Sequence, residues 1–518
     1  MILSDQSDVI EALSSPETYG NSVDRISIRR SHIALIFFAG EYVYKLKRAV
    51  VYPGVDFSTP EKRKLACIAE MKRSTVYAPH LIVGVKPIRR LKNGKIKIGG
   101  HAGEEIDTVI VEKRLPNKAI LSFRLPSSDF DRFEAMDLAE HLADLHTKAK
   151  TFHSKWGIDV IKNIILENES ILSCFPSCIN LTELNTLTRH SLEILHKNES
   201  LIKFRQKSGH VKKCHGDLLL SNIAYDNGKF LFFSPIEYND SLDCIDTLYD
   251  LAFLTMDLEL RGLRRIANVL FNHYMSYMND IEGFPLMGLY QSMRAASRAA
   301  VCAKTSVFLE GEEKQHTIEQ TRKYFELAKH FLINFKPVLI ACGGLSGSGK
   351  SRVARRIGGL MNPAPGAVIL RDDVVKKQIT GLALHQRFNK TTDTPAFEKV
   401  VYEVLRQQAT CALSAGSTVI LDALFQNEYE RLAVEKLAES LNIPFIGLWM
   451  DAPLSVRTQR VKSRGQKPSD IRKEVEPECQ LCLETGHISW HIINTDMSKE
   501  ETVQQAKEVL KKHLNMNL

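Results

Sequence analysis

Eight residues, Gly344 to Ser351 in the order Gly-Leu-Ser-Gly-Ser-Gly-Lys-Ser, fit the G-x-x-x-x-G-K-[ST] pattern of a phosphate-binding loop. Glycines let such a loop curl so that successive backbone N–H groups and the next helix N-terminus face an anion. We expect Lys350 to reach the β- and γ-phosphates of a nucleoside triphosphate and the Ser351 hydroxyl to complete a Mg²⁺ shell. The other loop residues expected to bind the nucleotide are Gly344, Ser346, Gly347, Ser348 and Gly349.

A second group of reactive residues lies in the stretch from Cys214 to Asn222, which reads Cys-His-Gly-Asp-Leu-Leu-Leu-Ser-Asn. Its His-x-Asp-x4-Asn spacing is typical of a kinase catalytic loop. In such a loop Asp217 would accept the proton of a substrate hydroxyl, and Asn222 would hold a Mg²⁺ ion. Glu237 follows the next apolar run, where a second metal-binding carboxylate is expected.

Three further carboxylates follow apolar runs in the carboxyl-terminal half. Asp372 and Asp373 end a strand pattern over residues 368–373, and the carboxyl ends of strands in an open α/β sheet border the ligand crevice. Either carboxylate could deprotonate an acceptor hydroxyl or order Mg²⁺-bound water, while capping of the following helix is an alternative. Asp422 ends the run over residues 417–422, which has the form of a nucleotide-metal carboxylate.

The elements that position the phosphate-binding loop alternate between strands and helices. A strand pattern precedes the loop, a helix follows it, and three more strand–helix pairs continue towards the end of the chain. Thr394 and Pro395 fit the N-cap and first position of one of these helices. The order predicts an α/β domain with a mostly parallel, doubly wound sheet over residues 336–518.

The elements around the second group predict an α+β arrangement. Strands over 31–40 and 41–47, a helix capped by Thr59 and further strands would form a small lobe at about 20–115. Helical patterns would then form a large lobe at about 116–332. A lysine on a strand and Glu70 on the next helix could pair, as kinases require to hold the α- and β-phosphates.

The helix expected over residues 293–304 carries three basic side chains, namely Arg294, Arg298 and Lys304. We favour the interpretation that they form a solvated basic face. The alternative is that they line a substrate cleft of the large lobe.

Composition sets the class of protein. The chain has 518 residues, 25% of them charged, and a formal net charge of +8, which is too diffuse to indicate a nucleic-acid partner alone. Its ten cysteines show no disulfide framework, which favours reduced thiols and a cytoplasmic location. Neither a signal peptide nor a transmembrane run is evident, so no membrane association is expected.

These motifs resemble the aminoglycoside phosphotransferase family, which shares the protein-kinase-like fold, and more closely a bacterial fusion of such a domain with a P-loop kinase. The resemblance implies Lys45, with Lys47 as the alternative, as the phosphate-pairing lysine and Glu70 as its helix partner. It also implies a nucleotide hinge near residues 111–114. The chain departs from the family in having Glu237 where an Asp is usual.

Ser234 is a second departure, because similar fusions often carry an aspartate there. If that aspartate is the true metal ligand, the resemblance implies weaker metal binding in this chain. The carboxyl-terminal half is similar to gluconate kinase, chloramphenicol phosphotransferase and the kinase part of polynucleotide kinase. In that group, arginines of a lid embrace the triphosphate, which implies roles for Arg460 and Arg464.

The sequence therefore predicts a protein that binds ATP and Mg²⁺ at two phosphotransfer sites and phosphorylates hydroxyl groups of small molecules. One alternative is 5′-hydroxyl phosphorylation of a polynucleotide by the carboxyl-terminal domain. It needs a basic groove, which Lys376 and Lys377 permit without indicating it. The other alternative is a ligand-sensing kinase-like domain coupled to a P-loop ATPase.

Overall fold

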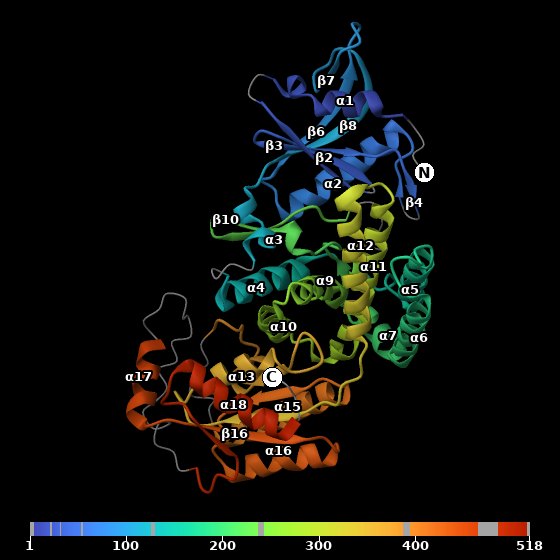
Figure 1. Ribbon diagram of the computed structural model, residues 1–518. Coiled ribbons are helices and arrows are strands. Elements are labelled where there is room, and N and C mark those ends of the chain that lie inside the picture. Colours follow the sequence, from blue (N-terminus) through green and yellow to red (C-terminus); the bar gives the residue numbers. More distant parts are fainter. Residues whose placement is uncertain are drawn as a thin grey trace. The chain divides into compact units, whose positions relative to one another are not determined.

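The computed structural model describes residues 5–20, 23–31, 33–52, 55–125, 130–236, 243–386, 394–464 and 485–514, without the side chain of Arg464. The chain forms two compact units, which are described separately (Figure 1). Unit 1 comprises Met1–Phe130, Lys148–Leu254 and Met293–Ala328. Unit 2 comprises Asp131–Thr147, Thr255–Ser292 and Lys329–Leu518. The domain limits at 332 and 336 stay predictions.

Unit 1 begins with a six-stranded antiparallel sheet in the order β1-β2-β3-β8-β6-β7. The strands are β1 (Ile26–Arg30), β2 (Ala34–Ala39), β3 (Tyr42–Lys47), β6 (Ile82–Arg90), β7 (Ile96–Ile98) and β8 (Glu104–Lys113). A short pair, β4 (Val51–Tyr52) and β5 (Val55–Asp56), follows β3, and α1 (Ser7–Ser14) precedes the sheet. This sheet, with the helix described next, confirms the expected α+β class; strand β1 was not foreseen.

Helix α2 (Pro60–Tyr77) packs against β8 and β6 of this sheet. It begins where the sequence predicts, because Thr59 Oγ1 accepts a hydrogen bond from the Lys62 amide at 3.3 Å and Pro60 occupies the first turn. The helix face turned towards the sheet buries Arg63, Cys67 and Glu70. This start point therefore sets which acidic side chain faces β3.

The rest of unit 1 is mainly helical and carries two small antiparallel pairs. The helices are α3 (Leu121–Arg124), α5 (Ile158–Ser173), α6 (Leu181–Lys197), α7 (Glu199–Lys207), and those parts of α9 (Thr247–Leu260), α11 (Phe284–Ser306) and α12 (Gly311–Phe331) that fall within it. The pairs are β9 (Val211–Lys213) with β12 (Cys244–Asp246), and β10 (Ile223–Asp226) with β11 (Lys229–Phe232). The catalytic-loop motif lies in the chain between β9 and β10.

Unit 2 contains a five-stranded sheet in the order β14-β15-β13-β16-β17. The strands are β13 (Leu339–Gly343), β14 (Val368–Arg371), β15 (Val419–Asp422), β16 (Phe445–Asp451) and β17 (His491–Asn494), and all pairs are parallel. The helices that alternate with these strands or follow them are α13 (Lys350–Gly358), α14 (Asp372–Thr380), α15 (Pro395–Ser414), α16 (Glu428–Ser440), α17 (Leu454–Arg464) and α18 (Lys499–Leu514). Unit 2 also contains most of α4 (Arg132–Lys148) and all of α10 (Arg264–Met278). This arrangement confirms the expected α/β class and places the phosphate-binding loop after the middle strand.

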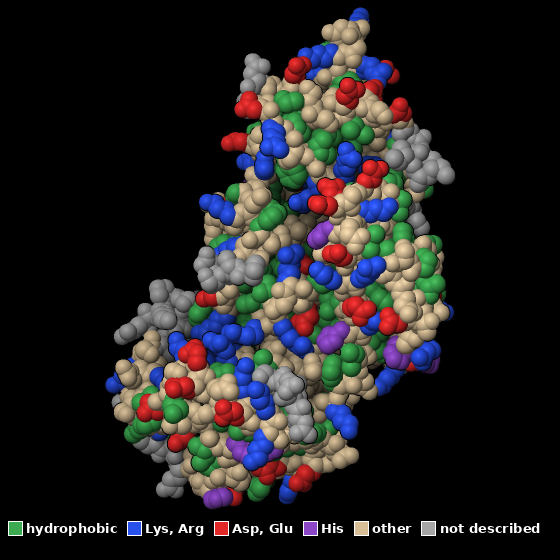
Figure 2. Space-filling view, in the orientation of Figure 1, with side chains coloured by type: hydrophobic (Ala, Val, Ile, Leu, Met, Phe, Trp, Pro, Cys, Tyr) green, Lys and Arg blue, Asp and Glu red, His purple; other side chains and the backbone are tan. Residues whose placement is uncertain are grey.

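The surface of the molecule mixes the two signs of charge. Figure 2 shows acidic and basic side chains interspersed over the visible face, with basic side chains gathered where α10 (Arg264–Met278) and α13 lie in Figure 1. Arg265 and Arg356 lie close enough there that, besides burial, the charge of Arg356 lowers the pKa of Arg265. Among the described helices, none combines the length and apolar character that crossing a bilayer requires.

Helix α10 covers the edge strand of the parallel sheet. The side chain of Asn272 accepts a hydrogen bond from the Ile369 amide at 2.6 Å and donates one to the Ala367 carbonyl at 3.0 Å. Asn268 donates to the same Ala367 carbonyl at 2.9 Å. Two asparagine amides thus satisfy backbone groups of β14 and the residue before it, on the strand that has a sheet neighbour on one side only.

We predict that Asn272→Ala destabilises unit 2 by about 1–3 kcal/mol, because the buried Ile369 N–H loses its partner, while the Ala367 carbonyl keeps its bond from Asn268. Faster hydrogen exchange at Ile369 and a lower melting temperature would report the loss. The matched control is Gln504→Ala, whose amide bonds only the exposed Glu508. Equal melting temperatures for the two variants would contradict the edge-covering role.

Candidate functional site

The predicted lysine of unit 1, Lys45 on β3, is buried among three partners. Its Nζ lies 3.1 Å from Glu70 Oε1, 2.8 Å from Glu112 Oε1 and 2.8 Å from Ser234 Oγ. Burial alone lowers the pKa of Lys45, but Glu112 and Glu70 outweigh it and hold this pKa above its usual value. The structure thus brings Lys45 and Glu70 together in the arrangement that the sequence predicts, with the ammonium charged.

The alternative lysine, Lys47, shares the same glutamate. Its Nζ lies 2.6 Å from Glu70 Oε2 and 5.4 Å from the centre of the Phe57 ring. Burial raises the pKa of Glu70, but Lys47 and Lys45 together bring it below its usual value. Both lysines project from the same face of β3, as strand alternation predicts, and Lys45 is the one that also contacts Ser234.

The catalytic-loop motif of unit 1 is held by a buried aspartate that the sequence did not single out. Asp250, on α9, accepts hydrogen bonds from the His215 and Gly216 amides, each at 2.9 Å. Asn222 Nδ2 donates to Asp217 Oδ2 at 2.8 Å and to the Asp217 carbonyl at 2.9 Å. The predicted base and the predicted metal-holding amide are therefore neighbours on a fixed loop.

His215 links this loop to the lysine. Burial lowers the pKa of His215, so the imidazole is neutral near pH 7. Its Nδ1 lies 3.3 Å from the Asp217 amide and accepts, so its Nε2, at 3.1 Å, donates to the Phe233 carbonyl. The next residue, Ser234, has a left-handed backbone (φ 57°) and contacts Lys45. Predicted ligand Glu237 lies outside the described residues.

Two contacts of this site were missed by the sequence analysis. Glu112 is in the stretch expected to form a nucleotide hinge, yet its carboxylate contacts Lys45. Ser234, which stands in place of an aspartate, meets the same ammonium with a neutral hydroxyl. The alternating apolar pattern of β8 gives no signal for Glu112, because its partner is 67 positions away in the chain.

The interpretation of a solvated basic face on α11 is wrong for Arg294, which is only 5% exposed. Its guanidinium lies 3.7 Å from the centre of the Tyr249 ring, and its Nε donates to the Tyr249 carbonyl at 3.1 Å. One of its terminal nitrogens lies 3.8 Å from Asp250 Oδ1. An aromatic face and a carboxylate offset the loss of hydration.

The phosphate-binding loop of unit 2 turns tightly between β13 and α13. Gly344 donates its amide to the Leu424 carbonyl at 3.1 Å, and Lys350 Nζ lies 3.4 Å from the Leu345 carbonyl. Gly347 has φ 79°, and a Cβ at this residue would lie 2.5 Å from the Arg457 carbonyl oxygen. Backbone packing therefore requires glycine at this point of the loop.

Several buried polar atoms around this loop have no hydrogen-bond partner among the described residues, namely Ser346 Oγ, Ser348 Oγ and Asp422 Oδ2. Unpaired buried polar groups cost free energy that an incoming ligand recovers. Hydroxyls, loop amides and Lys350 suit a triphosphate, and the Ser351 hydroxyl with the Asp422 carboxylate suits Mg²⁺. The residues present therefore fit the nucleotide and the metal that the sequence predicts.

The two acidic candidates beside the loop differ in their surroundings. They occupy the first turn of α14 instead of the end of a strand, because β14 stops at Arg371. The Arg371 guanidinium lies 2.5 Å from Asp373 Oδ2 and 3.9 Å from Asp422 Oδ2, a contact that the sequence analysis missed. Burial and the neighbouring Asp373 raise the pKa of Asp372 to about 7. Asp372 is therefore better suited to accept a proton near neutral pH.

Arg460 on α17 lies against the phosphate-binding loop. Its terminal nitrogens lie 3.5 Å from the Gly347 carbonyl and 2.6 Å from the Thr495 carbonyl. Thr495 Oγ1 in turn donates to the Ser348 carbonyl at 2.7 Å. The structure thus brings Arg460 to the loop through Thr495, a residue that the sequence analysis did not select. The side chain of Arg464 lies outside the described residues.

The lysines that would permit a polynucleotide groove are engaged within unit 2. Lys376 pairs with Glu398, and buried Lys377 donates to the Leu384 carbonyl at 2.8 Å. Neither side chain is available as an unpaired phosphate contact.

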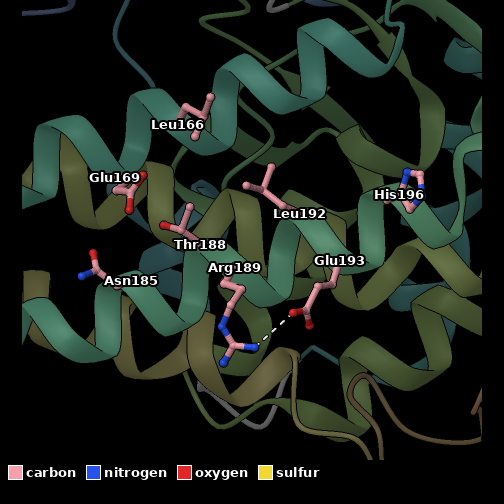
Figure 3. Close-up of a pocket in the computed structure, with 8 residues that line it drawn as sticks. All are labelled: Leu166, Glu169, Asn185, Thr188, Arg189, Leu192, Glu193 and His196. Atoms are coloured by element: carbon pink, nitrogen blue, oxygen red, sulfur yellow. Dashed lines mark hydrogen bonds and ion pairs between the residues drawn. The ribbon is translucent and has the colours of Figure 1, made fainter.

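A pocket also lies between α5 and α6 of unit 1 (Figure 3). Its lining includes Leu166, Leu192 and an exposed Arg189–Glu193 ion pair of 3.0 Å. None of the predicted site residues lines it, so it is separate from both candidate sites.

Comparisons with known proteins identify similarity in the carboxyl-terminal half and over nearly the whole chain. The model of the AAA domain family matches residues 339–478, which confirms the P-loop resemblance of the carboxyl-terminal half. Uncharacterized protein Rv2004c of Mycobacterium tuberculosis is 25% identical over 497 residues, covering 93% of this chain and 95% of the relative. Uncharacterized protein Mb2027c of Mycobacterium bovis matches to the same extent.

Two solved kinase structures are similar to shares of the chain that differ in size. A gluconokinase from Sinorhizobium meliloti is 19% identical with a TM-score of 0.24, covering 35% of this chain and 97% of that chain. A Plasmodium vivax ethanolamine kinase is 14% identical with a TM-score of 0.36, covering 60% of this chain and 83% of that chain.

We predict that Gly347→Ala weakens ATP binding to unit 2 by about tenfold or more, equivalent to about 1.4 kcal/mol, because the loop must move away from the Arg457 backbone. Equilibrium binding of a fluorescent ATP analogue measures the change. The control is Gly381→Ala, which has a similar φ of 68° but open space around its Cβ. Equal binding by both variants would contradict the account of the loop.

We predict that Asp372→Asn stabilises unit 2 above pH 7 while it lowers turnover. The folded-state pKa of Asp372, about 7, exceeds the ordinary value of 3.8, so its contribution to stability is full below pH 4 and lost as pH rises through 7. Asparagine stays neutral, so at pH 8 the variant should melt above the wild type, by about 2–4 °C for each kcal/mol gained in the free energy of unfolding. At pH 4 the two melting temperatures should differ little. The exposed control Asp496→Asn should show no such pH dependence; a matching profile would overturn this explanation.

Proposed function

We propose that this chain is an ATP-dependent phosphotransferase with two sites, each of which transfers the γ-phosphoryl group to a hydroxyl of a small molecule. The observation that carries the proposal is the pairing in unit 1 of Lys45 with Glu70 and of Asp217 with Asn222. A phosphate-holding pair and a proton-accepting aspartate are both needed for kinase chemistry. The AAA family match over residues 339–478 and the loop of unit 2 support a second nucleotide site.

In unit 1, Asp217 accepts the proton of the acceptor hydroxyl. The acceptor oxygen then bonds to the γ-phosphorus as the bond to the β–γ bridging oxygen breaks, and ADP leaves. Asn222 keeps the Asp217 carboxylate oriented through the 2.8 Å bond to Oδ2. Lys45 holds the α- and β-phosphates, which requires one of its three present contacts to open.

Mg²⁺ supplies charge neutralisation between the β- and γ-phosphates when it is bound. Asn222 in unit 1, and Ser351 with Asp422 in unit 2, are the described residues that would hold it. Three buried atoms near the loop, Ser346 Oγ, Ser348 Oγ and Asp422 Oδ2, have no hydrogen-bond partner within the described ranges, which favours this assignment.

In unit 2, Asp372 serves as the proton acceptor because burial and the neighbouring Asp373 place its pKa near 7. Arg371 neutralises Asp373 and so limits the negative charge that faces an arriving phosphate. Arg460 steadies the loop from α17 and adds positive charge beside it.

A second candidate function is a kinase-like domain that binds a ligand without phosphorylating it. The contact between Lys45 and the neutral hydroxyl of Ser234 favours this candidate, because a metal-binding aspartate is expected at that place. The rate of ATP turnover by unit 2 would then depend on whether unit 1 has bound its ligand.

We predict that the two sites separate by mutation. ADP release is measured with Mg²⁺-ATP and a pooled library of hydroxyl compounds. Asp217→Asn should remove the acceptor-dependent ADP release that is due to unit 1, and Lys350→Ala should remove the share that is due to unit 2. Each loss should reach about 10²-fold or more in its own part, the usual size of general-base catalysis. The control is Asp226→Asn, a half-buried aspartate of β10 that accepts a hydrogen bond from its neighbour Asn227.

Label transfer from γ-labelled ATP distinguishes phosphorylated product from free phosphate. If all turnover depends on Lys350 and all label appears as free phosphate, the phosphotransferase proposal fails and the ligand-sensing candidate replaces it. A response to 5′-hydroxyl oligonucleotides alone would instead assign the polynucleotide alternative to unit 2.

A further inference from the structure

Helix α11 carries a second arginine, Arg298, one turn beyond Arg294 and on the same face of the helix. The Arg294 guanidinium lies 3.8 Å from Asp250, which accepts the amides of His215 and Gly216. Those two residues directly precede Asp217. The face of α11 that carries Arg298 is thereby fixed towards the predicted catalytic loop.

The cations around this loop differ in whether a carboxylate lies within ion-pair distance. Arg73 lies 3.2 Å from Asp243, and Arg294 lies 3.8 Å from Asp250. Arg298 instead lies 5.8 Å from the centre of the Tyr324 ring and hydrogen-bonds the Tyr324 side chain, and within the described ranges it has no carboxylate within ion-pair distance. Its Nε is buried and finds no hydrogen-bond partner in the described part of the chain, as is also true of one nitrogen each of Arg73 and Arg294, so the missing carboxylate is what sets Arg298 apart.

The charge of Arg298 is nevertheless retained. Burial lowers the pKa of Arg298, but Tyr324, Cys302 and Asp217 outweigh it and raise this pKa above its usual value. A partly buried guanidinium with an unused donor is costly until an anion meets it. A planar guanidinium fork matches the oxygens of carboxylates and phosphates.

We propose that Arg298 binds an oxyanion of the acceptor, so that the substrate of the kinase-like site is a small hydroxylated carboxylate or phosphate. This inference rests on the proposed phosphotransfer function of unit 1. Asp217 fixes where the acceptor hydroxyl must lie, and Arg298, in electrostatic reach of Asp217, meets the far end of the same molecule. A cationic acceptor such as an amino alcohol would be repelled by Arg298.

The test uses the full chain carrying Lys350→Ala, which removes phosphate binding by the loop of unit 2. With a non-hydrolysable ATP analogue and Mg²⁺ present, calorimetry measures binding of three pools of hydroxyl compounds. The anionic pool holds hydroxy acids and sugar phosphates, the neutral pool sugars, and the cationic pool amino alcohols. The variants are Arg298→Gln, Arg298→Lys and the control Lys304→Gln, a cation of the same helix whose charged neighbour is Glu167.

We expect a compound of the anionic pool to bind, and Arg298→Gln to weaken it by about tenfold or more, whereas Lys304→Gln leaves it unchanged. Arg298→Lys should recover part of the affinity, because it keeps the charge but loses the fork. In turnover assays, Arg298→Gln should raise KM for the acceptor and leave KM for ATP unchanged.

Preference for the neutral or cationic pool, no binding of any anionic compound, or unchanged binding in Arg298→Gln would each overturn the proposal. A raised KM for ATP would also overturn it, by assigning Arg298 to the nucleotide. If an anionic compound binds through Arg298 but no label reaches it in any assay, the oxyanion site stands and the phosphotransferase function of unit 1 fails.

Discussion

A buried ammonium group must be matched by carboxylates, and unit 1 is arranged around this requirement at Lys45. Its three partners come from α2, β8 and the segment after β11, so one charge ties the sheet, the helix and the catalytic region together. Removing one partner of a buried ion pair costs about 3–5 kcal/mol. The contact with Ser234 also joins Lys45, through the Phe233 carbonyl, to His215 of the catalytic loop.

The residues expected to bind nucleotide phosphates are partnered differently in the two candidate sites. In unit 1 the lysine is fully partnered, so nucleotide phosphates must exchange with a contact that already exists. In unit 2 the buried atoms Ser346 Oγ, Ser348 Oγ and Asp422 Oδ2 have no hydrogen-bond partner among the described residues, so a triphosphate and its metal would recover that free-energy cost. This difference predicts tighter nucleotide binding by unit 2 than by unit 1.

Local features of both units could be predicted from the sequence because their causes are local. The caps at Thr59 and Thr394 fix two helix starts, and the motif at Gly344 fixes the loop. Contacts between residues far apart in the chain leave no pattern in the sequence. Glu112 contacts Lys45, and Thr495 bonds Ser348 from 147 positions away. The sequence analysis placed Arg294 in solvent because charged residues of a helix are usually exposed. In the structure its guanidinium lies against the Tyr249 ring and near Asp250.

The central claim is that each unit holds its own nucleotide-phosphate site, and binding stoichiometry tests it most directly. A non-hydrolysable ATP analogue with Mg²⁺ should fill two sites per chain. Lys350→Ala should leave the weaker site, and Lys45→Met should leave the tighter one. A single site in the wild type that disappears in Lys350→Ala and is untouched by Lys45→Met would contradict the account, because unit 1 would then hold no nucleotide.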